Sequence, residues 1–346
     1  MRIVVNDIAA SYGGAMSVLK QFYNYIKEND KQNEWIFILS GNYLEETERI
    51  KIVINTDVKK SGLHKLWFDF ISGRNFINKL HPDLVLSLQN IITFGVKVPQ
   101  IVYIHQSIPF QNEKKFSFFK SNERSVAIIQ YLIGSIIKLS AKKADKIIVQ
   151  TNWMKEAVLK AIGQNDKNCL VALPDIEICN TLPELNLVKG QFFYPTSNVI
   201  YKNNNLLIET CDILESLGFN SFKIKLTLPQ QTILHKNIDC IGRLNTAQMF
   251  DMYSTSVLVF PSYFETVGLP LLEAKKVGTL IFAADCRYSR EILSDYENAY
   301  FFDYREPSQL AKLMSDCLSG KIELKNTDIY INKDATSWNK VIDFLK

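Results

Sequence analysis

The stretch VLVFPSYFETVGLPLLEA, residues 257–274, decides the fold of the second half of this chain. Its first four residues are all apolar, which is typical of a strand buried on both faces of a parallel sheet. A loop follows, and Pro270 stands where the first turn of a helix tolerates a missing N–H group. We therefore predict a strand, a loop with Glu265 and Gly268, and a helix whose first amides can bind an anion.

Short apolar runs alternate with segments of helical period along the rest of the chain, as in parallel α/β proteins. The runs lie at residues 2–6, 35–39, 84–88, 101–105, 146–150, 191–195, 222–228, 257–262 and 280–285. The alternation breaks across residues 171–190, which carry two prolines and little periodicity. We expect two Rossmann-like α/β domains that face each other across a cleft, with ligands beyond the carboxyl ends of their strands.

These patterns divide the 346 residues into four segments. Residues 1–170 are expected to form the N-terminal domain, residues 171–190 a linker, and residues 191–335 the C-terminal domain. Residues 336–346 have apolar side chains at helical spacing. We expect this last segment to form a helix that packs back across the domains.

The composition is that of a globular protein, with 47% hydrophobic and 22% charged residues. Forty basic and thirty-six acidic side chains leave a net charge of +4, which is too small for a general nucleic-acid binder. Six cysteines without a C-x-x-C pair indicate buried thiols in a reducing cytosol rather than zinc ligands or disulfides. Since the apolar runs are too short for a signal peptide or a membrane span of about 20 residues, we expect a cytoplasmic protein.

Two glutamates mark the helix start in the opening stretch, with Glu265 before it and Glu273 in its first turn. With the Gly-Leu-Pro turn between them, this E-x7-E spacing resembles the signature of the retaining glycosyltransferases of family 4, which have the GT-B fold. The resemblance implies that Glu265 contacts hydroxyls of the donor sugar and that Glu273 holds the ribose of the nucleotide. Without it, both would be interpreted as solvated glutamates at a helix end.

The backbone of this turn belongs to the same resemblance, which is strongest over residues 191–300. The amides of Thr266, Val267, Gly268 and Leu269 would line the sugar and the diphosphate of the donor. These four residues are therefore assigned to donor binding.

A second match follows the apolar run at residues 191–195. The family commonly places an arginine there and, five residues later, a lysine, and both grip the diphosphate. Lys202 fits the lysine, whereas Ser197 stands at the position of the arginine. Leaving-group stabilisation would then rest on Lys202, on the hydroxyls of Thr196 and Ser197, and on the helix amides. Because Ser197 replaces the family's arginine, Lys202 can also be interpreted as an ordinary solvated lysine without a role in binding.

Two loops are assigned more loosely through the resemblance. Arg243 and Leu244 precede a predicted helix and resemble the loop that holds the nucleobase through backbone groups. Backbone contacts leave no side-chain code that separates UDP from GDP, and a UDP-sugar is the favoured donor. Gly13 and Gly14 lie before the helical pattern of residues 16–26 and resemble the family's acceptor-side loop. Paired glycines allow close backbone approach to a ligand.

His105 is the one histidine placed for chemistry, because it ends the apolar run at residues 101–105. The family often has a histidine here that meets the donor sugar, although a lone histidine at a strand end is otherwise structural. With Glu265 and Lys202 it forms the candidate catalytic set. Since no D-x-D pair occurs in the loops expected to face the cleft, we expect no metal and no other cofactor.

Residues 111–146 combine basic and aromatic side chains, with eight basic and three acidic residues and with Phe116, Phe118 and Phe119. This combination is typical of peripheral contact with an anionic membrane and would suit a lipid-linked acceptor. The apolar run at residues 128–139 can equally be a core helix of the N-terminal domain.

Together these features predict a hexosyltransferase-type enzyme that moves a sugar from a nucleotide diphosphate donor to a glycan or lipid-linked acceptor, with retention. The abundance of Asn, Lys and Ile suggests an AT-rich bacterial genome, and capsule or other surface-polysaccharide assembly fits such an enzyme. Two alternatives stay open. One is a GT-B sugar-nucleotide epimerase, and the other is an inactive glycosyltransferase-like scaffold, to which Ser197 gives some weight.

Overall fold

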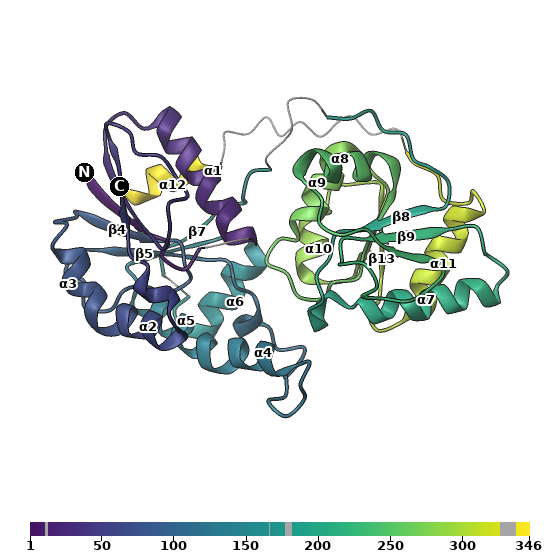
Figure 1. The fold of residues 1–346 in the computed structure, drawn as a ribbon, viewed down its shortest axis with the longest axis horizontal. Helices are drawn as coiled ribbons and strands as arrows, with labels where there is room; N and C mark the ends of the chain where they lie inside the picture. Colours follow the sequence, from purple (N-terminus) through teal and green to yellow (C-terminus); the bar gives the residue numbers. More distant parts are fainter. Residues whose placement is uncertain (11–12, 166, 177–181, 326–336) are drawn as a thin grey trace. The chain divides into compact units, whose positions relative to one another are not determined.

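The chain folds into two α/β units, each built on its own parallel sheet (Figure 1). The computed structural model describes all residues except 11, 12, 166, 177–181 and 326–336. Among the described residues, the N-terminal unit comprises Met1–Phe119, Arg124–Asp175 and the chain end from Ser337, and the remainder forms the C-terminal unit. The expected fold class, two parallel-sheet α/β domains, is thus confirmed.

The N-terminal unit contains a seven-stranded sheet in the order β3-β2-β1-β4-β5-β6-β7, with every pair parallel. Its strands are β1 (Arg2–Asn6), β2 (Glu34–Leu39), β3 (Ile50–Ile54), β4 (Leu84–Ser87), β5 (Gln100–Ile104), β6 (Lys146–Val149) and β7 (Cys169–Val171). Its α-helices are α1 (Gly13–Asn29), α2 (Gly62–Trp67), α3 (Gly73–Asn78), α4 (Arg124–Ala127), α5 (Gly134–Lys143), α6 (Asn152–Ile162) and α12 (Ser337–Leu345). Short 3-10 turns lie at Asp57–Lys59 and Ile108–Phe110, and π-helical turns join α2 to α3 (Phe68–Ser72) and α4 to α5 (Ile128–Ile133).

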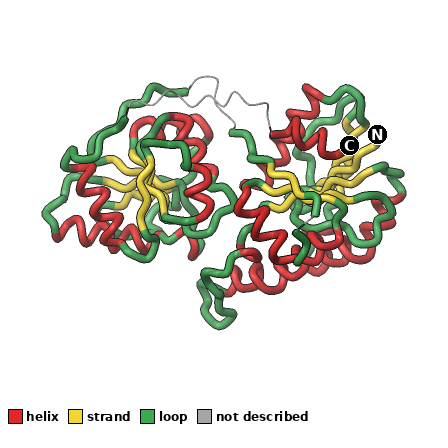
Figure 2. The backbone as a smooth tube through the Cα atoms, turned by 180° about the vertical axis from the view of Figure 1, so that it is seen from behind, coloured by secondary structure: helices red, strands yellow, loops and turns green. Residues whose placement is uncertain are grey.

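Helices cover both faces of this sheet. In both views, α1 and α12 lie on one face, and the helices from α2 to α5 lie on the other (Figures 1 and 2). Phe22 of α1 packs on Trp35 and Phe37 of β2, while Phe68 and Ile77 pack beneath the opposite face. Buried on both sides, the inner strands are continuous apolar runs, as parallel strands require.

The C-terminal unit contains a six-stranded parallel sheet in the order β10-β9-β8-β11-β12-β13. Its strands are β8 (Gln191–Tyr194), β9 (Lys223–Leu226), β10 (Ile238–Cys240), β11 (Val257–Phe260), β12 (Ile281–Ala284) and β13 (Ala299–Phe302). Its helices are α7 (Asn204–Ser216), α8 (Thr246–Thr255), α9 (Leu269–Val277), α10 (Arg287–Ile292) and α11 (Pro307–Leu318), with a 3-10 turn at Ile200–Lys202. The strand order reverses between β8 and β11, so their carboxyl ends form the switch point of this sheet.

The C-terminal helix α12 packs on the N-terminal unit. Trp338, Val341 and Leu345 are buried there, and the Trp338 ring lies 5.0 Å from that of Phe22. The carbonyl oxygen of Phe344 accepts a hydrogen bond from Lys146 Nζ at 2.7 Å. The chain therefore returns to its first unit after completing the second.

Three sequence expectations need correction. Helix α1 begins at Gly13 and not at residue 16, because the first helical turn leaves its N–H groups without helix partners and so tolerates a glycine pair. The interval of residues 171–190 is not a free linker throughout, since Val171 completes β7 and Gly190 leads into β8. Of the described cysteines, none of which forms a disulfide, Cys169 and Cys211 are buried, whereas Cys240, Cys286 and Cys317 are half-exposed; Cys179 lies outside the described residues.

A buried carboxyl group stands directly after β1. The side chain of Asp7 is 2% exposed, and its Oδ1 has no hydrogen-bond partner. Burial raises the pKa of the Asp7 carboxyl to about 8, although the charge of Lys65 opposes the shift. The folded protein therefore holds a proton on Asp7 in a pH range where the unfolded chain has lost it.

This proton makes the stability of the N-terminal unit pH-dependent. Between about pH 4 and pH 8, Asp7 alone should lower the free energy of unfolding by about 1.4 kcal/mol per pH unit as the pH rises. Asp7→Asn should abolish this component. Urea unfolding at several pH values, followed by tryptophan fluorescence, measures the free energy of unfolding of this unit, because the unit contains all four tryptophans. If the native chain and Asp7→Asn lose stability equally as the pH rises, the pH dependence does not come from Asp7.

Candidate functional site

The candidate site lies where β8 and β11 end, at the carboxyl edge of the C-terminal sheet. The chain leaves β8 through residues 195–203 and leaves β11 through residues 261–268. Parallel strands deliver both loops to the same edge, so side chains 63 positions apart in the sequence come into contact.

An ion pair joins the two loops. Lys202 Nζ lies 2.6 Å from Glu265 Oε1, and each side chain is 18% exposed. The hydroxyl of Ser262 donates a second hydrogen bond to the same carboxylate oxygen at 2.7 Å. The structure thus brings together two of the three predicted catalytic residues, and both of these donors bond Oε1 of Glu265.

Backbone hydrogen bonds fix the geometry of this pair. The amide of Tyr263 donates to the carbonyl of Tyr201 at 3.0 Å, and the buried Tyr194 hydroxyl donates to the carbonyl of Lys202 at 2.9 Å. Asn203 then leaves the turn with a φ of +58°, and its side chain donates to the carbonyl of Tyr304. The turn that carries Lys202 is held by its backbone, which leaves the ammonium group available to exchange partners.

Glu273 lies on α9, with its carboxylate held by α8. The hydroxyl of Tyr253 donates to Glu273 Oε2 at 2.6 Å. Removal from water raises the pKa of Glu273, and the hydrogen bond from Tyr253 opposes that shift. A carboxylate oriented by one donor and poorly hydrated gains most from further donors, such as the two hydroxyls of a vicinal diol.

The turn between the two glutamates starts α9 at Leu269. Gly268 has a φ of +75°, and a Cβ atom placed on it would lie 3.1 Å from the ring of Tyr288. Only glycine enters this conformation without strain. Thr266 is half-buried and Val267 is buried, and the N-terminal end of α9 carries the partial positive charge that favours an anion.

Thr196 and Ser197 leave the end of β8. Thr196 exchanges hydrogen bonds with the hydroxyl of Thr227 after β9, through its amide at 2.8 Å and its carbonyl at 2.9 Å. Its own hydroxyl donates to Asn204 Oδ1 at 2.9 Å, and Asn204 donates to the carbonyl of Ser197. Thr196 is thus built into the loop, whereas the side chain of Ser197 is exposed.

Arg243 and Leu244 follow β10, between the left-handed Gly242 and the capping box of Asn245 that begins α8. Arg243 is exposed and Leu244 is half-buried. They lie on the loop that leads into the helix of Tyr253, so the structure connects this loop to Glu273 through α8.

The other predicted residues belong to the N-terminal unit. His105 follows β5, with Nε2 3.1 Å from the carbonyl oxygen of Leu88 and 3.0 Å from Asn90 Nδ2. Enclosure by protein lowers the pKa of His105 to about 4, so the ring is neutral near pH 7. Gly13 and Gly14 form the N-terminal end of α1, and a Cβ on Gly14 would meet no atom within 4 Å.

Sequence reasoning missed the side chains that position the candidate site. Tyr253, Ser262, Asn204 and Thr227 each donate or accept a hydrogen bond within it. Tyr253 stands 20 residues before the glutamate that it orients, and no local pattern marks such a distant partner. Ser262 lies three residues before Glu265, inside the quoted stretch, where its polarity within an apolar run was the available signal.

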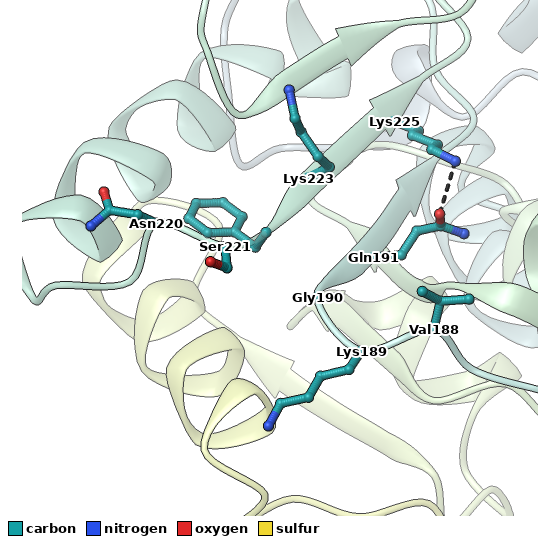
Figure 3. A pocket seen from close by; sticks show the side chains of 9 residues that line it. Val188, Lys189, Gly190, Gln191, Asn220, Ser221, Lys223 and Lys225 are labelled. Atoms are coloured by element: carbon teal, nitrogen blue, oxygen red, sulfur yellow. Dashed lines mark hydrogen bonds between the residues drawn. The ribbon is translucent and has the colours of Figure 1, made fainter.

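A pocket of about 330 Å³ lies elsewhere on the C-terminal unit, at the amino ends of β8 and β9 (Figure 3). Its lining includes Lys189, Lys223 and Lys225, and Lys225 donates to Gln191 Oε1 at 2.8 Å. Ligands of such sheets bind at the opposite, carboxyl edge, so this pocket is separate from the candidate site. Among the described residues, no group of three or more His, Cys, Asp or Glu is arranged to hold a metal ion.

The basic, aromatic segment is only partly exposed. Phe116 is buried, with its amide bonded to Gln130 Oε1 at 2.9 Å, which corrects its expected place in an exposed loop. Phe118 and Phe119 are exposed. By length and composition Arg124–Lys143 is a helix that could span a membrane. Here it packs on the N-terminal unit, since Ile137 and Ala141 are buried and Ser140 Oγ accepts from the Ile92 amide.

The comparisons with known proteins agree with this architecture. Residues 220–334 match the family of glycosyl transferases group 1. No curated protein matches the chain in sequence. Structures do match: the chain resembles WaaG, a glycosyltransferase involved in lipopolysaccharide biosynthesis, with a TM-score of 0.65, 14% identity and full coverage of both chains.

Two further structures share the fold. Sucrose-phosphate synthase from Thermosynechococcus elongatus matches with a TM-score of 0.65 and 13% identity over 92% of this chain and 90% of its own. Anabaena HepE, solved in complex with UDP and glucose, matches with a TM-score of 0.61 and 14% identity over 93% and 90%. The structural matches confirm the GT-B fold over nearly the whole chain. The resemblance to the group 1 glycosyl transferases is confirmed over residues 220–334.

The energetic link between the two strand ends can be measured by a double-mutant cycle. Lys202→Met and Glu265→Gln should each destabilise the C-terminal unit, and the double variant should recover part of the loss, giving a coupling of about 1–3 kcal/mol. Hydrogen exchange of the β8 and β11 amides measures the free energy of unfolding of the C-terminal unit. The exposed pair Lys223–Asp239, 3.1 Å apart, serves as control and should couple less strongly. Equal coupling in the two pairs would contradict the assignment.

Proposed function

We propose that this chain transfers a sugar, with retention of anomeric configuration, from a nucleotide diphosphate donor to a glycan or lipid-linked acceptor. The observation that carries the proposal is the Lys202–Glu265–Ser262 network at the switch point of the C-terminal sheet, beside the N-terminal end of α9. The group 1 family match covers part of the same unit. The C-terminal unit would hold the donor, and the N-terminal unit would hold the acceptor.

Each residue has a defined part in this proposal. Lys202 would leave Glu265 for the diphosphate, and the amides from Thr266 to Leu269 would bind its remaining oxygens. Glu265 would then accept hydroxyls of the donor sugar, and Glu273 would accept those of the ribose. The absence of an arginine at Ser197 places more of the leaving charge on Lys202 and on the end of α9.

The bond changes follow from retention. The bond between the sugar C1 and the phosphate oxygen breaks as the acceptor oxygen forms its bond to C1 on the same face. The acceptor proton passes to the departing phosphate oxygen, so the diphosphate serves as the base. The protein contributes position and electrostatic stabilisation, which lowers the barrier without a protein nucleophile. Lys202 and the helix end would neutralise the diphosphate, so we propose transfer without a metal ion or other cofactor.

The finer specificity is also a proposal. A UDP-hexose is favoured as donor, with Arg243 and Leu244 at the base, and the structural similarity to HepE, which was solved with UDP and glucose, supports that choice. Similarity to WaaG supports a role in the assembly of capsule or other surface polysaccharide. Residues 111–146 would hold the enzyme at the inner face of a bacterial membrane, where lipid-linked acceptors are found.

Nucleotide binding tests the donor site. UDP at 100 times its dissociation constant should stabilise the protein by about 2.7 kcal/mol, with smaller effects of GDP and ADP. Tyr253→Phe removes the donor that orients Glu273, so UDP affinity should fall by about tenfold or more, and Glu273→Gln should weaken it similarly. Thermal unfolding and calorimetry measure both effects.

Tyr296→Phe is the matched control, because it also removes a buried tyrosine hydrogen bond, to the carbonyl of Thr279. It should leave UDP affinity unchanged. If no nucleotide stabilises the chain, or if Glu273→Gln binds UDP as tightly as the native protein, the donor-site assignment is wrong. Conversion of a nucleotide sugar without any acceptor would favour an epimerase instead.

A further inference from the structure

The N-terminal unit carries an exposed apolar surface built from two helices and one loop. Of the eighteen large hydrophobic side chains that are exposed among the described residues, twelve lie here. They are Leu63, Leu66, Trp67, Phe70 and Ile71 from α2 and the following π-turn, Phe118 and Phe119 from the loop, and Ile128, Tyr131, Leu132, Ile133 and Leu139 from the helix that ends in α5. We call these twelve residues the apolar face.

The spacing of these residues shows that each helix presents a continuous stripe. Leu63, Leu66, Trp67, Phe70 and Ile71 follow the i, i+3, i+4, i+7, i+8 pattern of one helical side. The opposite side of the same helix is already buried, through Phe68 and Ile77. This segment is thus apolar on two sides, and packing on its own sheet explains only one of them.

The second helix repeats the arrangement. Ile128, Tyr131 and Leu132 are exposed, while Gln130 and Ile137 are buried beneath. Both helices cover the same face of the sheet, and in both views they lie on the side away from α1 and α12 (Figures 1 and 2). A π-helical turn lies within each exposed stripe, and such turns are frequent at functional sites.

The two chain segments that carry the apolar face have a net positive charge, although Lys146, at the end of the second segment, bonds the Phe344 carbonyl of α12 on the opposite face of the sheet. Residues 57–79 contain five basic and two acidic side chains, and residues 111–146 contain eight and three, so the two segments together carry +8. Since the whole chain carries +4, everything else sums to −4. Of the two acidic groups in the first segment, Asp69 is buried and paired with Lys65 at 2.6 Å, and Asp57 is paired with Lys60.

We propose that the apolar face docks on an anionic lipid surface, and that the helix of Leu63 and Trp67 is as much a part of the contact as residues 111–146. Apolar stripes flanked by lysines enter the interface between headgroups and acyl chains, with the helices lying in its plane. Trp67 is 58% exposed, and an indole favours that boundary. A second copy of the chain fits less well, because it would bring two surfaces of like charge together.

Vesicle binding tests this proposal without donor or acceptor, so its outcome is independent of the proposed transfer reaction. The full chain should co-sediment with vesicles of phosphatidylcholine and phosphatidylglycerol, and far less with phosphatidylcholine alone. The double variant Leu63→Ser/Trp67→Ser should bind the anionic vesicles about tenfold more weakly or worse. The matched control Leu217→Ser/Leu234→Ser also removes two exposed apolar side chains, from the C-terminal unit, and should bind like the native protein.

Tryptophan fluorescence supplies a second readout. Trp67 is the exposed tryptophan, whereas Trp35, Trp153 and Trp338 are 1%, 8% and 2% exposed. Anionic vesicles should therefore shift the emission to the blue, and Trp67→Phe should keep binding while losing the shift. The proposal is overturned if the native chain ignores anionic vesicles or if the Leu63/Trp67 variant binds them equally well. It is also overturned if the same variant dissociates a dimer while vesicle binding is absent.

Discussion

The ion pair between Lys202 and Glu265 is the contact on which the candidate site depends. It joins the loop after β8 to the loop after β11 at the reversal of strand order, where a parallel sheet leaves a crevice. The backbones of these two loops are also bonded directly, because the amide of Tyr263 donates to the carbonyl of Tyr201, while the Tyr194 hydroxyl donates to the carbonyl of Lys202. The ion pair therefore adds a side-chain contact across two loops whose backbones are already joined.

In the proposed function, the same pair would let Lys202 bind the diphosphate of the donor. In the structure Lys202 neutralises Glu265, and the two charges are largely removed from water. A diphosphate that binds Lys202 would release the carboxylate of Glu265, which could then accept hydrogen bonds from sugar hydroxyls. Each group would thus exchange one favourable contact for another. Glu273 is also prepared to accept hydrogen bonds. The Tyr253 hydroxyl already donates to its Oε2, and because the carboxylate is largely removed from water, further hydrogen-bond donors would stabilise it.

The sequence predicted the inner strands and missed the outer ones for one reason. Nine apolar runs matched β1, β2, β4, β5, β6, β8, β9, β11 and β12, whereas the four missed strands, β3, β7, β10 and β13, are the two edges of each sheet. Edge strands pair on one side only and can be short or incompletely buried: β7 and β10 have only three residues each, and in IKIVI at Ile50–Ile54 Lys51 interrupts the apolar run and only Ile50 is buried. Likewise, the E-x7-E spacing marks the two glutamates, but Tyr253 becomes adjacent to Glu273 only when α8 packs on α9.

The most direct test of the central claim, that Glu265 belongs to the donor-sugar site of a transferase, is release of the nucleoside diphosphate from a panel of nucleotide sugars by the native chain and by Glu265→Gln. We expect turnover of Glu265→Gln to be lower by about 100-fold or more, with nucleotide affinity nearly unchanged. Glu297→Gln, which alters an exposed carboxylate of the same unit, should turn over normally. Unchanged turnover in Glu265→Gln would show that Glu265 does not belong to the donor-sugar site.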